Sequence, residues 1–212
     1  MRISAALMLL ILECGVTPAQ TSTPPLADPQ QMPSNIAADS YQIYSDILGK
    51  FDSWSSTDGH FLVLATTIPA VPAGQNCEQQ KPQREETVDP NGSDSDPNQK
   101  RNFQEVMEGF DAHCHDVLSL TADSFETSLP VRLLSRQEAN VEGFEVSPKW
   151  AQGYRWYLFE FSEVYFNYGR NFAIVYVEAR NGGPSPRRNW LTFQLRNGKW
   201  ERFHGDVAPW LH

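Results

Sequence analysis

The C-terminal half of the chain alternates apolar and polar residues with the spacing of β-strands. Five stretches there are rich in β-branched and aromatic residues, as strands are. These stretches are Tyr157–Phe161, Val164–Tyr168, Phe172–Ala179, Trp190–Leu195 and Lys199–Phe203. Between the last two, Asn197-Gly198 predicts a tight hairpin turn that brings Leu195 opposite Trp200. We therefore expect an antiparallel sheet of about five strands.

The apolar positions change parity between the first two stretches. Phe159 and Phe161 share one parity, whereas Val164 and Phe166 have the other. One irregularity at Ser162-Glu163 puts both sets on the same face of the sheet. The pattern thus predicts a bulge or bend at this point and a curved sheet.

Two stretches upstream have helical spacing instead. Residues 39–50 carry Tyr41, Tyr44, Ile47 and Leu48 on one stripe, and residues 99–110 carry a second such stripe. Asp39 or Ser40 can cap the first helix, and Asn98 can cap the second.

Short apolar runs at His60–Thr67 and Val131–Leu134 predict further strands. With the two helices packed on one face of the sheet, the fold class is α+β.

The N-terminus has the organisation of a secretory signal peptide. Arg2 precedes a short apolar run, and Thr17-Pro18-Ala19 supplies small residues at positions −3 and −1, so we expect cleavage after Ala19. The run is about half the roughly 20 residues that span a bilayer, so no transmembrane anchor is expected after cleavage. Lipidation of Cys14 is an alternative that the large, charged Glu13 before it disfavours. The sequence predicts a secreted or periplasmic protein.

The rest of the chain divides by composition. Residues 20–37 are rich in Pro, Gln and Ser and predict a disordered tether. Residues 38–212 are expected to form a single folded domain, which is interrupted by a disordered acidic loop at about 68–98.

Charge is unevenly spread along the domain. The formal net charge is −9, which argues against nucleic acid as a partner. Bases nevertheless gather in the C-terminal part, where Arg180, Arg187 and Arg188 are candidates for a patch that meets an anion or a protein partner of the cell envelope.

Two cysteines remain after the predicted cleavage. Cys77 and Cys114 are expected to pair in an oxidising compartment, and the bridge would tie the acidic loop to the second helix. The alternatives are two free thiols or a nucleophilic Cys114 beside a histidine.

The segment His113-Cys-His-Asp116 is the strongest polar cluster. Histidine and aspartate are transition-metal ligands, and His113 and Asp116 share a helix face at i and i+3. His115 is a further candidate ligand, and His60 or His204 could complete the set.

A second candidate for acid–base chemistry is a carboxylate pair, Glu160 and Glu163, near the expected bend.

Three short motifs resemble those of a set of exported bacterial proteins with the pattern FSxVxFN…AxVYV…GxW. They are Phe161–Asn167, Ala173–Val177 and Asn197–Trp200, and the likeness extends over about residues 38–67 and 130–205. The resemblance implies export and supplies no reaction or catalytic residue. Members of the set carry Cys-Gly-Gly after the AxVYV strand, where this chain has Asn181-Gly-Gly.

No catalytic motif stands out along the chain, and no cofactor is predicted. The leading hypothesis is a non-enzymatic binding or interaction module of the periplasm or cell exterior. The alternative is a hydrolase-like or metal-binding enzyme that uses the segment from His113 to Asp116.

Overall fold

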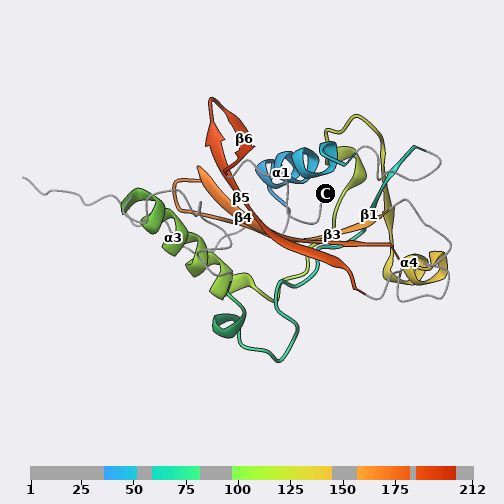
Figure 1. Ribbon diagram of the computed structural model, residues 1–212, viewed down its shortest axis with the longest axis horizontal. Helices are drawn as coiled ribbons and strands as arrows, with labels where there is room; N and C mark the ends of the chain where they lie inside the picture. Colours follow the sequence, from blue (N-terminus) through green and yellow to red (C-terminus); the bar gives the residue numbers. More distant parts are fainter. Residues whose placement is uncertain (1–35, 52–58, 82–96, 145–156, 182–184, 204–212) are drawn as a thin grey trace, which may run out of the picture. The chain divides into compact units, whose positions relative to one another are not determined.

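A computed structural model of the chain describes residues 36–51, 59–81, 97–144, 157–181 and 185–203 (Figure 1). The predicted signal peptide, nearly all of the tether, residues 82–96 of the acidic loop, and His204 lie outside these ranges. Within them, no helix has both the length and the apolar character needed to cross a membrane.

Six strands of the described chain form one open, mixed sheet in the order β2-β1-β3-β4-β5-β6. They are β1 (Phe61–Leu64), β2 (Val131–Leu134), β3 (Leu158–Phe166), β4 (Phe172–Arg180), β5 (Arg187–Arg196) and β6 (Lys199–Arg202). The last four strands form an antiparallel meander, whereas β1 runs parallel to both β2 and β3.

The α+β class and the curved sheet are confirmed. Asn197 and Gly198 turn the last hairpin with φ angles of 51° and 77°, and Leu195 faces Trp200 as expected. The expectation of about five antiparallel strands is corrected. The upstream strands β1 and β2 join the same sheet and are parallel, because the long connection between them returns the chain to the same end of the sheet.

The helices lie on both faces of the sheet, not on one face as expected (Figure 1). Helix α1 (Ala38–Gly49) packs on one face, and α3 (Pro97–His113) packs on the other. The physical reason is that β3 and β4 are apolar on both sides: Ala173 and Val175 face α1, whereas Phe172 and Ile174 face α3.

Packing, not capping, holds α1. Tyr44 is fully buried and stacks on Phe161 with ring centroids 4.6 Å apart. The residue before the helix, Ala37, has extended backbone angles but offers no side-chain cap, so the expected caps at Asp39 and Ser40 lie inside the helix. The expected cap Asn98 likewise lies inside α3, which begins at Pro97.

A third helix, α4 (Arg136–Glu142), was not predicted. Ser135 and Glu138 form a reciprocal capping box at its start, and Gly143 ends it with φ 86°. The signal was present in the sequence as Ser-x-x-Glu followed by glycine. Its apolar stripe is weak, since Ala139 is its one buried residue, and the helix therefore escaped a search based on periodicity.

Candidate functional site

Three side chains with metal-binding or acid–base chemistry meet where α3 ends. His113 is the last residue of α3, Asp116 follows it, and Glu163 comes from the middle of β3. One ligand atom from each lies within 4.8 Å of the other two. His113 Nδ1 and Asp116 Oδ2 are 2.7 Å apart, a hydrogen bond that the imidazole donates to the carboxylate. We call this group the His113–Asp116–Glu163 cluster.

A β-bulge positions Glu163. The β3–β4 register shifts between Phe161 and Val164, as the parity change predicted, so Ser162 and Glu163 together lie opposite Tyr176. The Ser162 hydroxyl accepts from the Tyr176 backbone N–H at 2.9 Å and donates to the Glu163 carbonyl at 2.7 Å. From the other face, the Tyr44 hydroxyl donates to the Ser162 carbonyl at 2.8 Å. The bulge is therefore fixed by hydrogen bonds on both sides.

Backbone pairing brings Asp116 to the bulge. The segment after β1 runs beside the segment after α3, with hydrogen bonds from Val71 N to Cys114 O and from Thr67 N to Leu118 O. Ile68 N also donates to Phe161 O at 2.7 Å. One short segment thus links the end of α3 to the bulge in β3.

Glu163 is the least compensated charged group of the cluster. Its Oε2 atom is buried and has no hydrogen-bond partner among the described residues. Burial raises the pKa of the Glu163 carboxyl to about 7, and the Asp116 carboxylate adds to the rise while His113 opposes it. Burial also raises the pKa of the neighbouring Tyr165 hydroxyl, with Glu163 contributing. Such a carboxyl holds or releases a proton near neutral pH.

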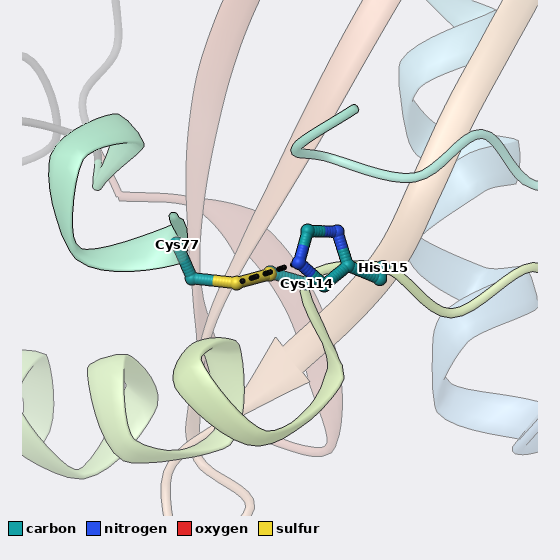
Figure 2. Close-up of side chains that lie close together, drawn as sticks. All are labelled: Cys77, Cys114 and His115. Carbon is teal, nitrogen blue, oxygen red and sulfur yellow. Dashed lines mark hydrogen bonds between the residues drawn. A yellow bond between two sulfur atoms is a disulfide. The ribbon is translucent and has the colours of Figure 1, made fainter. Parts of the chain in front are cut away.

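The predicted disulfide is present next to this cluster (Figure 2). Cys77 belongs to the short 3₁₀ helix η2 (Cys77–Gln80), and Cys114 directly follows α3. Their Cα atoms are 6.2 Å apart. Cys114 is almost fully buried among apolar side chains of α3, whereas Cys77 is partly exposed. The bridge fixes the end of α3 and with it the position of His113.

His115 lies apart from the other two predicted ligands. Its Nδ1 is 2.9 Å from the Val71 carbonyl oxygen, and its Nε2 is 3.4 Å from Cys77 Sγ (Figure 2). The predicted trio is thus divided: His113 and Asp116 meet Glu163, and His115 joins the cysteines.

Glu163 is the member of the cluster that its position in the sequence does not assign to it. Proximity along the chain pairs Glu163 with Glu160, yet in the structure those two glutamates have different neighbours. The bulge was the available signal, because it turns the residue after Ser162 away from the parity of Phe161.

Glu160 belongs to a separate ion-pair network on the α3 and α4 side of the sheet. It is 1% exposed and contacts Arg136 and Arg180, each at 2.9 Å. Burial raises the pKa of the Glu160 carboxyl, while the two guanidinium groups oppose that rise. Glu178 continues the network, with Arg180 at 2.6 Å and Arg188 at 2.8 Å.

The three arginines predicted as a patch therefore have neighbours inside the fold. Arg180 and Arg188 are paired with the strand glutamates Glu160 and Glu178. Arg187 lies over the Tyr157 ring, with its guanidinium carbon 5.5 Å from the ring centroid.

Three cavities of the described chain lie away from the cluster. One of about 450 Å³ is beside α4, and one of about 350 Å³ is beside the start of α1. A third, of about 10 Å³, lies between α1 and β5. His113, Asp116 and Glu163 line none of the three.

Comparison with protein-family models, curated protein sequences and solved structures gives no match for this chain.

Proposed function

We propose that this chain is an exported protein whose folded domain binds a divalent transition-metal ion through His113, Asp116 and Glu163. The observation that carries the proposal is the buried Glu163 Oε2, which has no hydrogen-bond partner among the described residues and lies beside a histidine and a second carboxylate. A buried polar atom without a partner costs stability, and a cation would remove that cost. On this proposal, the function of the folded domain is to bind the metal ion.

The donor set indicates the class of metal. One imidazole and two carboxylates suit Zn²⁺ and related divalent ions. In the metal-free chain, His113 Nδ1 donates a hydrogen bond to Asp116 at 2.7 Å. A bound cation would replace the proton between these two atoms, because ligand atoms must be free of protons, and the ring would then carry its proton on Nε2. His113 Nδ1 and Asp116 are therefore already placed side by side as ligands.

The elevated pKa of Glu163 predicts competition between protons and the metal. Only the ionised carboxylate is a good ligand, and its pKa is about 7. Metal affinity should therefore fall as the pH decreases from 8 to 6.

Export is the second part of the proposal. It is supported by the basic tip, apolar run and small residues of the first 19 positions, and by the disulfide, which is compatible with an oxidising compartment. The mass of the protein isolated from the exported fraction should match a chain that begins at Gln20. An intact N-terminus in the cytosolic fraction would contradict this part alone.

The metal is tested by calorimetric titration of the disulfide-bonded chain with Zn²⁺ at pH 7.5. We expect one equivalent to bind. Glu163→Gln and His113→Gln should each weaken binding by at least about tenfold, because each removes one ligand. Glu201→Gln, which changes an exposed glutamate of β6, is the matched control and should leave the affinity unchanged. Absence of saturable binding, or equal affinity in wild type and Glu163→Gln, would overturn the proposal.

A second candidate is acid–base catalysis by the same cluster. The observation that favours it is the pKa of Glu163 near 7, which suits a group that exchanges protons at neutral pH. It ranks below metal binding because a bound cation would also give the buried Glu163 Oε2 the partner that it lacks among the described residues. A hydrolytic activity on a panel of ester and phosphoester substrates that persists in chelator and is lost in Glu163→Gln would favour it.

A further inference from the structure

The Cys77–Cys114 disulfide has a histidine placed on one of its two sulfur atoms. His115 Nε2 is 3.4 Å from Cys77 Sγ (Figure 2). His115 and Cys77 are both accessible to solvent, whereas Cys114 is 1% exposed. The two sulfur atoms are therefore unequal: an external thiol can reach Cys77, and Cys114 is shielded.

A backbone contact fixes the tautomer of His115. The Val71 carbonyl oxygen can only accept a hydrogen bond, so the His115 Nδ1 that lies 2.9 Å from it carries the proton. In the neutral ring, the Nε2 lone pair then faces Cys77 Sγ. In the protonated ring, Nε2–H donates to that sulfur. The ring is thus oriented either to take a proton from a Cys77 thiol or to stabilise a Cys77 thiolate.

We propose that Cys77–Cys114 is an exchange-active disulfide that oxidises dithiols, with His115 as the residue that stabilises the Cys77 thiolate. The co-reactant is a small-molecule or protein dithiol. This inference does not depend on the metal site, because it uses a different histidine and a different ligand chemistry.

The exchange proceeds in two balanced steps. A thiolate of the dithiol attacks Cys77 Sγ, the Cys77–Cys114 bond breaks, and Cys114 leaves and takes a proton. The second thiolate of the dithiol then attacks the other sulfur of the dithiol, which is bonded to Cys77 in the mixed disulfide. This step releases Cys77 as a thiolate, which His115 stabilises. Two electrons pass from the dithiol to the protein, one of its two protons goes to Cys114 and the other to solvent, and the dithiol leaves as a disulfide.

The charged side chains near Cys77 are paired with one another. Lys81, which follows η2, is paired with Glu78 at 2.6 Å and with Asp111 of α3 at 2.7 Å. His113 and Asp116 are paired with each other. These neighbours largely balance one another, whereas the His115 ring lies in contact with Cys77 Sγ. Stabilising the thiolate favours the reduced form and makes the disulfide a better oxidant.

The first test is the pH profile of Cys77 alkylation. The reduced protein is treated with iodoacetamide between pH 5 and 9 in the presence of a chelator, and each cysteine is followed by peptide mass spectrometry. A free thiol has a pKa near 8.5, and we expect the Cys77 midpoint at least about one pH unit lower. His115→Asn keeps an N–H for the Val71 carbonyl but lacks Nε2, so its midpoint should return to about 8.5.

The control is Glu78→Gln, which changes an exposed charge next to Cys77 and should alter the alkylation rate by less than about twofold. Equal midpoints in wild type and His115→Asn would overturn the proposal. So would a wild-type midpoint near 8.5, which is also the result expected if the reduced chain unfolds.

The second test follows the exchange itself in the native protein. Brief treatment with glutathione should give a mixed disulfide on Cys77 and not on Cys114. In equilibrium with glutathione, His115→Asn should be about tenfold harder to reduce than wild type, a shift of about 30 mV. His115→Gln serves as a second variant if His115→Asn misfolds. A glutathione adduct on Cys114, or equal equilibria in wild type and both variants, contradicts the assignment.

Discussion

The two faces of the sheet differ in what they bury. The α1 face is a continuous apolar core, in which Phe159, Phe161 and Phe193 are fully buried. The α3 face has two smaller apolar clusters, and on this side the strands also carry Glu160, Glu178 and the bulge residue Glu163. Strand alternation separates the apolar residues from Glu160 and Glu178, and the bulge places Glu163 on the α3 side. The difference indicates that the α1 face supplies most of the stability of the fold, whereas the α3 face carries the buried ionisable side chains.

The largest expected effect on stability comes from removing a side chain from the apolar core on the α1 face. Phe193→Ala removes a fully buried ring of β5 on the α1 side. We expect a loss of about 3–5 kcal/mol in the free energy of unfolding. Denaturant unfolding measures the loss. Zn²⁺ affinity at a temperature where the variant is folded should remain that of wild type, and a joint loss of affinity would show that the two faces are not separable.

The next effect concerns the ion-pair network. Arg180→Met leaves Glu160 and Glu178 without a shared partner on the α3 side. Breaking a buried pair by removing one member costs about 3 kcal/mol, which urea unfolding at pH 7 would detect. The cost should shrink as the pH decreases, because burial raises the pKa of the Glu160 carboxyl and the group then takes up a proton. A cost that is independent of pH would mean that the arginine contributes packing and not charge.

Glu163→Gln is expected to stabilise the metal-free chain. The folded-state pKa, about 7, lies above the unfolded value of 4.5, so the folded chain holds this proton more tightly. The favourable contribution is full below pH 4.5 and is lost as the pH rises through 7. Glutamine cannot ionise, so the variant should exceed wild type by about 1–2 kcal/mol above pH 7, after reduction for partial solvent exposure.

Thermal unfolding in chelator at pH 8 and at pH 4.5 checks this prediction. The two proteins should differ at the higher pH and agree at the lower one. A destabilised variant at pH 8 would show that the Glu163 carboxylate has a stabilising partner.

The smallest effect is at the start of α1. Ala37→Ser supplies the side-chain cap that the helix lacks, and its extended backbone already suits a capping residue. We expect a gain of about 0.5–1 kcal/mol by denaturant unfolding. Ala37→Val cannot accept a hydrogen bond and is the control. Equal stability of Ala37→Ser and wild type would mean that packing alone sets the position where the helix begins.

Much of the fold was predictable because its signals are local. Asn197-Gly198 defines its own hairpin, and the parity change at Ser162-Glu163 reveals the bulge. The face chosen by each helix was not predictable, because β3 and β4 are apolar on both sides. Likewise, β1 and β2 pair across almost 70 residues of chain, a choice that no local pattern records.

The candidate site was half predictable for the same reason. His113 and Asp116 are close in sequence, and the turn that follows α3, in which Asp116 N donates to His113 O, brings their side chains together. Glu163 reaches them only through the pairing of Ile68 with Phe161 and of Val71 with Cys114, which are contacts between distant segments. His115 turns toward Cys77 and away from His113 because its ring contacts the Val71 carbonyl. No sequence pattern predicts that contact.

The most direct test of the metal site is an anomalous-difference map from crystals of the disulfide-bonded protein grown with one equivalent of Zn²⁺. We expect one strong peak within bonding distance of His113, Asp116 and Glu163. A peak at another place in the fold, or no peak at a concentration that saturates the calorimetric titration, would contradict it.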